Sequence, residues 1–143
     1  MGERVLETGL KHGTVTVVID GEPLEITTYR VDGSYSDHRR PDTVSFTRSL
    51  REDVERRDFT MNALAYNPST GIVDLVGGVK DIEAKILRCV GDPDRRFQED
   101  ALRILRALRF ASVLGLEIEP ATAKAAHKNK NLLKAIAAER IQV

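Results

Sequence analysis

The sequence has no net charge, no second cysteine and no long apolar run. Its 22 basic side chains equal its 22 acidic ones, so overall charge does not indicate nucleic-acid binding, and such contacts would have to come from local clusters. The single cysteine, Cys89, excludes an intramolecular disulfide and fits a reducing compartment. No apolar run approaches the roughly 20 residues of a membrane span, and no signal-peptide core is present. We therefore expect a cytoplasmic protein without a membrane partner.

The first third of the chain is predicted to be β-structure. The 143 residues, 41% hydrophobic and 31% charged, are enough for one ordinary domain or two small lobes that share a core. Residues 14–19 are rich in β-branched side chains, Asp20-Gly21 is typical of a hairpin turn, and residues 24–29 form the second strand. Residues 32–41 are polar, lack periodicity and indicate a loop.

The remainder is predicted to be mainly helical. Residues 49–65 have a helical pattern with a break near Asp58, and short strands over 72–75 and 86–90 enclose a helical turn at 81–85. Residues 91–94 interrupt the chain, which places a lobe boundary near residue 90. Beyond it, apolar residues at helical spacing from Phe97 to Leu114 predict one long helix ended by Gly115. Two further helices are predicted over 120–128 and 132–140.

Charged residues recur along this long helix: Glu99, Asp100, Arg103, Arg106 and Arg109. Residues three or four apart share a helix face, so one interpretation is a set of ordinary ion pairs worth about 0.2–0.5 kcal/mol each. The other interpretation is base recognition. Cytosine and adenine present an amino group beside an unprotonated ring nitrogen, which a carboxylate and a guanidinium match.

Guanine and uracil present an oxygen beside a protonated nitrogen at the same edge. They would leave buried groups of an Asp100–Arg103 pair without partners, which is a strong source of discrimination. One fixed pair could therefore accept C and A and reject G and U. Arg106 and Arg109 could meet phosphates or the base edge, although Arg109 could equally be solvated.

A second candidate motif covers residues 56–66. Asp58 could simply cap a helix that begins near Thr60. Alternatively, Arg57 could hold a triphosphate as a bidentate donor, while Asp58 or Asn62 bonds ribose hydroxyls. On its own, this motif does not decide between the two interpretations.

The motifs and their order along the sequence resemble those of class II tRNA CCA-adding enzymes and bacterial poly(A) polymerases. Residues 56–65 resemble the sugar- and nucleotide-binding motif of this family, residues 74–88 its head–neck hinge, and residues 99–110 its base-reading template. Residues 11–17 and 25–30 also match its head domain. The resemblance implies an α+β fold: an incomplete polymerase-β-like nucleotidyltransferase head, with mixed β-hairpin, sheet and helices, over residues 1–90, and the start of an all-α neck over 91–143.

The resemblance also implies a reaction and its participants. A 3′ hydroxyl of RNA, at the end of a tRNA, attacks the α-phosphate of CTP or ATP and releases pyrophosphate, assisted by two Mg²⁺ ions held by aspartates. It places nucleotide contacts at Arg57, Asp100, Arg103, Arg106 and Arg109. It places Asp58 and Asn62 in the sugar-binding motif. Residues 32–42 match a mobile loop that helps the family to switch between C and A.

The sequence departs from this family at the metal site. Family members have a Gly-rich segment and an Asp-x-Asp pair before the strand at 14–19, and neither occurs in residues 1–10. Asp92 and Asp94 have the Asp-x-Asp spacing but stand on the wrong side of the motif order. Glu25 is a candidate for the family's auxiliary carboxylate. We therefore expect no metal ligands in this chain and negligible CCA addition by the chain alone.

Four interpretations remain open at this stage. The chain is a nucleotide-recognising fragment of a CCA-adding enzyme, or a fragment of a poly(A) polymerase. It is one half of a split enzyme whose partner chain carries the aspartate pair, or it is a non-catalytic nucleotide- or RNA-binding module. We expect the first, although the motifs that carry the resemblance do not separate CCA addition from poly(A) synthesis or from addition of only CC or only A.

Overall fold

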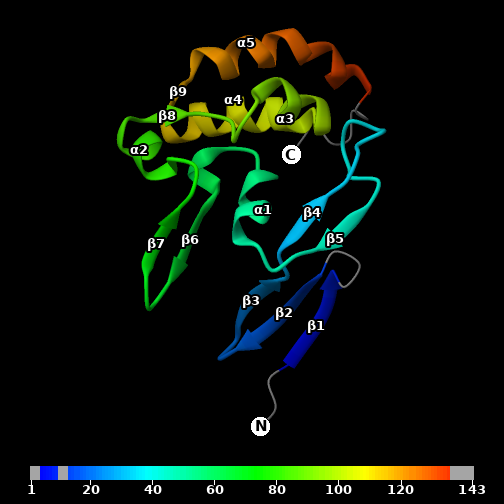
Figure 1. Ribbon diagram of the computed structural model, residues 1–143, viewed down its shortest axis with the longest axis vertical. Helices are drawn as coiled ribbons and strands as arrows, with labels where there is room; N and C mark the ends of the chain where they lie inside the picture. Colours follow the sequence, from blue (N-terminus) through cyan, green and yellow to red (C-terminus); the bar gives the residue numbers. More distant parts are fainter. Residues whose placement is uncertain (1–3, 10–12, 136–143) are drawn as a thin grey trace.

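The computed structural model describes residues 4–9 and 13–135, which form an α+β arrangement of small sheets and short helices (Figure 1). In chain order the elements are β1 (Arg4–Gly9), β2 (Thr14–Ile19), β3 (Glu22–Thr27), β4 (Arg30–Asp32), β5 (Val44–Phe46), α1 (Leu50–Glu55), the 3-10 helix η2 (Thr60–Asn62), β6 (Leu64–Asn67), β7 (Gly71–Asp74), α2 (Gly78–Glu83), β8 (Ile86–Leu87), α3 (Pro93–Glu99), α4 (Leu102–Leu114), β9 (Glu117–Ile118), α5 (Pro120–Asn129) and the 3-10 helix η3 (Lys130–Ala135). None of the described helices combines the length and apolar character needed to cross a bilayer.

Strands β1, β2 and β3 form an antiparallel sheet at the opposite end of the molecule from α3, α4 and α5 (Figure 1). The predicted hairpin is confirmed as β2 and β3. Its turn residues, Asp20 and Gly21, have φ angles of 51° and 86°, as the favoured two-residue hairpin turn requires. Strand β1 was not predicted, because its residues carry neither a clear alternation nor a flanking turn.

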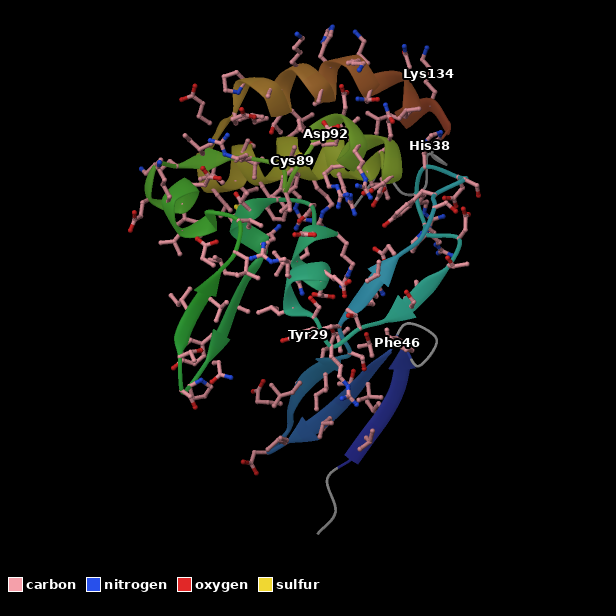
Figure 2. The ribbon with its side chains drawn as sticks, in the orientation of Figure 1. Tyr29, His38, Phe46, Cys89, Asp92 and Lys134 are labelled. Atoms are coloured by element: carbon pink, nitrogen blue, oxygen red, sulfur yellow. The ribbon has the colours of Figure 1, made fainter. Side chains whose placement is uncertain are left out.

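The segment predicted as a loop is bounded by the short antiparallel strands β4 and β5. Its tip reaches the helical end of the molecule, where His38 lies beside the α3–α4 junction (Figure 2). The Nδ1 atom of His38 is 2.6 Å from the carbonyl oxygen of Gln98, and the amide of Ala101 donates to the carbonyl of His38 over 3.0 Å. The loop is therefore tied to the junction by main-chain and side-chain contacts.

The region predicted as helical over 49–65 contains α1, η2 and the beginning of β6. The break near Asp58 is confirmed, but the helical prediction is wrong from Leu64 onward. Strand β6 pairs with β7 in a hairpin, with Tyr66 opposite Ile72. The local pattern could not reveal this, because a four-residue strand depends on its partner for its hydrogen bonds.

The single long helix predicted beyond residue 91 is two helices, α3 and α4. Asp100 separates them with an extended backbone, at φ −142° and ψ 104°. Its Oδ1 accepts from the amide of Leu102 over 3.0 Å, and local bonds of this kind compete with helical ones. Gly115 ends α4 in the left-handed conformation, at φ 63°, as predicted. The last predicted helix is η3 up to residue 135, and residues 136–140 lie outside the described part.

The main hydrophobic cluster joins the two halves of the sequence. Its buried members are Phe59, Leu87, Cys89, Phe97, Ile104, Ala107 and Ala125. Burial raises the pKa of the Cys89 thiol to about 12, so it packs as a small apolar side chain. Residues before and after position 90 thus share one core, and the division into lobes at that position stays a prediction. This shared packing fixes α4 against the segment that contains η2.

Candidate functional site

A cavity of about 520 Å³ lies between the segment joining α1 to η2 and the first half of α4. Its lining consists of Arg56, Arg57, Asp58, Asn62, Asp100, Leu102, Arg103, Arg106 and Phe110. Every residue predicted to contact a nucleotide is in this lining except Arg109. The two candidate motifs, which are about forty residues apart in the sequence, therefore form one site.

Asp100 occupies the break between α3 and α4. Its Oδ1 is held by the amide of Leu102, while its Oδ2 has no hydrogen bond to the described part of the chain. Burial raises the pKa of Asp100 above the ordinary 3.8, because a charged carboxylate is less stable away from water. One oxygen of a half-buried carboxylate is thus available to a donor in the cavity.

Arg103 is buried, with 8% of its surface exposed. Its Nη1 donates to Glu99 Oε2 at 2.9 Å and to the carbonyl of Arg96 at 3.1 Å. Its Nη2 donates to the carbonyl of Arg56 at 3.1 Å. An arginine has five N–H donors, so Nε and one hydrogen of Nη2 remain. Arg103 thus forms an ion pair with Glu99 and also lines the cavity. The ion-pair interpretation and the base-recognition interpretation therefore do not exclude each other.

Asp58 and Arg106 connect the two motifs. Arg106 donates from Nε and Nη2 to Asp58 Oδ2, over 2.8 and 2.7 Å, and its guanidinium lies 5.2 Å from the ring centre of Phe110. Asp58 Oδ1 accepts from the amide of Phe59 and from Asn62 Nδ2, over 2.8 and 3.2 Å. The helix-cap interpretation of Asp58 is wrong, because η2 has Phe59 at its N-cap position without a side-chain cap. A ribose hydroxyl would have to replace one of these four bonds.

Asp53, which the sequence analysis missed, holds the two arginines that follow α1. It is 2% exposed. Its Oδ1 accepts from Arg56 Nη2 at 2.6 Å and its Oδ2 from Arg57 Nη2 at 2.9 Å. Burial opposes ionisation of Asp53, but hydrogen bonds from Arg56 and Arg57 outweigh it and lower the pKa. The spacing of three and four residues along a helix was the available signal.

The residues resembling a hinge contact η2, whose last residue, Asn62, lines the cavity. Asp74 accepts from the amides of residues 76 to 79 over 2.8–3.1 Å, and these bonds, that of Val79 first, lower its pKa. The Thr60 hydroxyl donates to Asp81 at 2.8 Å, and Arg88 Nε donates to the same carboxylate. At Gly78, a Cβ atom would overlap the carbonyl of Thr60. The hinge residues thus hold η2 in place.

Four other residues named in the sequence analysis lie outside the cavity. Glu25 is exposed on β3, opposite Thr16, in the sheet away from α4 (Figure 1). Arg109 is exposed on α4. Asp92 caps α3 by accepting from the amide of Asp94, whose own carboxylate pairs with Lys128. Within residues 4–9 and 13–135, no group of three His, Cys, Asp or Glu side chains could hold a metal ion.

Two family models match the chain. The first, described as "Poly A polymerase head domain", matches residues 2–88. The second, described as "Probable RNA and SrmB- binding site of polymerase A", matches residues 115–143. Together they account for both ends of the sequence.

Curated relatives and solved structures agree with these matches. A CCA-adding enzyme of Pediococcus pentosaceus is 52% identical over 99% of this chain and 36% of its own length. One of Lactobacillus helveticus is 53% identical over 96% and 34%. The crystal structure of the Bacillus stearothermophilus CCA-adding enzyme in complex with CTP is 45% identical with a TM-score of 0.87, over 96% of this chain and 33% of that one.

A further similar structure is a tRNA nucleotidyltransferase complexed with a primer tRNA and an incoming ATP analogue. It is 34% identical, with a TM-score of 0.76, over 97% of this chain and 38% of that one. The chain therefore spans about a third of the length of the relatives that it matches.

Proposed function

We propose that this chain, which belongs to the family of poly(A) polymerase heads and CCA-adding enzymes, selects CTP and ATP for a template-independent RNA nucleotidyltransferase that extends tRNA 3′ ends. One observation carries the proposal: a half-buried carboxylate with an uncommitted oxygen and a restrained guanidinium line the same cavity. The relatives named as CCA-adding enzymes, and the similar structures described with CTP and with an ATP analogue, support it.

The selection follows from hydrogen-bond polarity. Asp100 Oδ2 accepts from the amino group that cytosine and adenine share, and a remaining donor of Arg103 serves the adjacent ring nitrogen. With guanine or uracil, the carboxylate would face an oxygen and the guanidinium a protonated nitrogen. Each mismatch leaves a partly buried group without a partner, at a cost of about 1–3 kcal/mol.

The rest of the nucleotide has partners at the other side of the cavity. Arg57 has a 42% exposed side chain and Arg106 a 47% exposed one, so both can meet phosphates while their carboxylate partners hold them in place. Asp58 and Asn62 are the proposed ribose contacts, and Asp58 would exchange one of its existing bonds for a hydroxyl. Arg109 lies farther along α4, where a contact to a nucleotide would need a longer reach.

Mg²⁺ would supply activation of the attacking hydroxyl and neutralisation of the leaving group. The residues of the cavity do not fit the ion, because Asp58 has both oxygens engaged and Asp100 has one free oxygen. We therefore assign choice of the nucleotide to this cavity and no step of bond formation. Addition of adenylate alone is the second candidate, since the matched head model is that of a poly(A) polymerase.

Substitution of Arg57 by glutamine tests the phosphate side of the proposal. We expect the affinities for CTP, ATP, GTP and UTP to fall together by about tenfold, because a charge-assisted contact common to all four is lost. Isothermal titration calorimetry measures this. Arg51→Gln, on α1 just before Arg57 and with a 63% exposed side chain, is the control and should change none of the four affinities. A loss confined to one or two of the bases would contradict the assignment.

The raised pKa of Asp100 predicts that base preference depends on pH. Ionised Asp100 accepts from an amino group, whereas the protonated form can donate to a keto oxygen. Because burial raises its pKa, protonation begins at a higher pH than for an ordinary aspartate. As the pH is lowered from neutrality, the ratio of CTP to UTP affinity should therefore decrease, and the decrease should begin at a higher pH than an ordinary aspartate would give.

Titration of the triphosphate affects both nucleotides equally, so it does not change the ratio of their affinities. Calorimetry in matched buffers gives the two affinities at each pH, and Asp100→Asn provides the control because it has no carboxyl group to titrate. A ratio that stays constant in the original protein, or that changes equally in the variant, would be incompatible with this role of Asp100.

A further inference from the structure

An ion pair in the wall of the cavity joins the segment before η2 to α4. Arg106 donates from both Nε and Nη2 to a single oxygen, Asp58 Oδ2, over 2.8 and 2.7 Å. The other oxygen, Oδ1, accepts from the amide of Phe59 and from Asn62 Nδ2. We call the contact at Oδ2 the Asp58–Arg106 bridge. It connects a residue proposed to contact ribose with a residue proposed to contact phosphates.

The two ends of the bridge differ in their freedom to move. The side chain of Asp58 is 11% exposed and that of Arg106 is 47% exposed. The main chain of Asp58 is fixed, because its carbonyl accepts from the amide of Val90 over 3.0 Å and the next residue, Phe59, is completely buried. Arg106 lies on the surface of α4, with its guanidinium 5.2 Å from the ring centre of Phe110, an attraction that does not depend on Asp58. Arg106 is therefore the partner that can move.

The bond that Asp58 can most easily exchange is the one to Arg106. A carboxylate has about four lone-pair sites, and Asp58 already accepts four hydrogen bonds. Those at Oδ1 come from a buried amide and from a residue of the same short segment, whereas those at Oδ2 come from the exposed guanidinium. Arg106 has five N–H donors, so three remain for a phosphate beside the two that Asp58 holds.

A triphosphate is a stronger partner for Arg106 than a single carboxylate. An ion pair with one well exposed member contributes little to stability, whereas a triphosphate carries several negative charges and offers many acceptor oxygens to a guanidinium. A triphosphate that engages the three remaining N–H groups therefore draws the guanidinium away from Asp58 Oδ2.

We propose that the Asp58–Arg106 bridge makes recognition of ribose conditional on the triphosphate. This inference rests on the proposed function. When a triphosphate draws Arg106 away, Asp58 Oδ2 loses its donors at a place with little access for water, and a ribose hydroxyl replaces them. A sugar without hydroxyls leaves the carboxylate oxygen unpaired, which is unfavourable. Without a triphosphate the bridge stays closed, Oδ2 has its donors in any case, and the hydroxyls of a nucleoside contribute little.

The first experiment needs no variant. The unaltered chain, labelled with ¹⁵N, is titrated with CTP, 2′,3′-dideoxy-CTP, cytidine and 2′,3′-dideoxycytidine, and nuclear magnetic resonance gives the affinities, including the weak ones of the nucleosides. Removal of both hydroxyls avoids any assumption about which of them contacts Asp58. We expect CTP to bind at least about tenfold more tightly than its dideoxy form, and the two nucleosides to agree within about twofold. Equal ratios for the triphosphates and the nucleosides would overturn the inference.

The second experiment removes the bridge. Arg106→Met keeps an unbranched side chain beside Phe110 but has no N–H donor, so Asp58 Oδ2 is open to a hydroxyl at all times. The variant should gain a preference of about tenfold for cytidine over dideoxycytidine, a gain that general damage to the site would not produce. Arg51→Met, which removes the same charge from a 63% exposed position, is the control and should keep this ratio within about twofold.

The outcomes separate this inference from the function on which it rests. An unchanged nucleoside ratio in folded Arg106→Met, with thermal unfolding recorded to establish folding, would overturn the inference. A preference for CTP and ATP over GTP and UTP, together with equal ribose ratios in the unaltered chain, would refute the inference alone. No base preference in the unaltered chain would instead refute the proposed function.

Discussion

Replacement of Asp53 by alanine is expected to lower the free energy of unfolding by about 3 kcal/mol. The carboxylate is almost fully buried and accepts from Arg56, Arg57 and the amide of Arg30. Its removal leaves partly buried donors without an acceptor and brings two positive charges together without compensation. Urea unfolding followed by circular dichroism measures the loss.

The pH dependence of stability provides a second check on Asp53. Its pKa is lower in the folded protein than the ordinary 3.8. A depressed carboxyl pKa contributes stability that is present above the unfolded-state pKa and is lost as the pH falls through the folded-state value. Asp53→Ala should lack this part of the acid dependence. Glu55→Ala, an exposed change on the same helix, should stay within about 0.5 kcal/mol, and an equal loss in both variants would contradict the assigned role.

Replacement of Asp100 by alanine should abolish base preference. Affinities for CTP and ATP are expected to fall by at least about tenfold, to the level of GTP and UTP, because the acceptor for the amino group is gone. Weak binding should persist through Arg57 and Arg106, which line the other side of the cavity. Calorimetric titration of the variant with the four triphosphates gives the comparison.

Asp94→Asn is the appropriate control for this change. Asp94 is close to Asp100 in the sequence, but its carboxylate pairs with Lys128 outside the cavity. It should leave the order of nucleotide affinities unchanged. If Asp100→Ala still preferred CTP and ATP, other residues would have to read the base, and the pairing of Asp100 with Arg103 would not be the selector.

The parts of the fold that the sequence predicted have strong local determinants. Asp20 and Gly21 support a tight hairpin turn, and Gly115 ends α4 in the left-handed conformation. Short strands such as β4, β6 and β9 depend on partners elsewhere and were not predicted, whereas the strands predicted over 72–75 and 86–90 correspond to β7 and β8. The division between α3 and α4 was hidden because apolar spacing continues across Asp100, where a side-chain bond and the loop carrying His38 decide the conformation.

The candidate site was predictable to the extent that its chemistry is local. The ion pair between Glu99 and Arg103 follows from helical spacing and is confirmed at 2.9 Å. The bidentate contact between Asp58 and Arg106 joins residues 48 positions apart, and no periodicity within either motif could indicate it. Asp53 and Arg96 are buried and hold several partners each. Burial is a property of the packed chain that composition alone does not predict.

The most direct test of the central claim is a set of calorimetric titrations of the unaltered chain with CTP, ATP, GTP and UTP under identical conditions. If Asp100 and Arg103 read the edge shared by cytosine and adenine, CTP and ATP should bind at least about tenfold more tightly than GTP and UTP, as expected for one or two mismatched hydrogen bonds. Equal affinity for all four nucleotides would contradict the account.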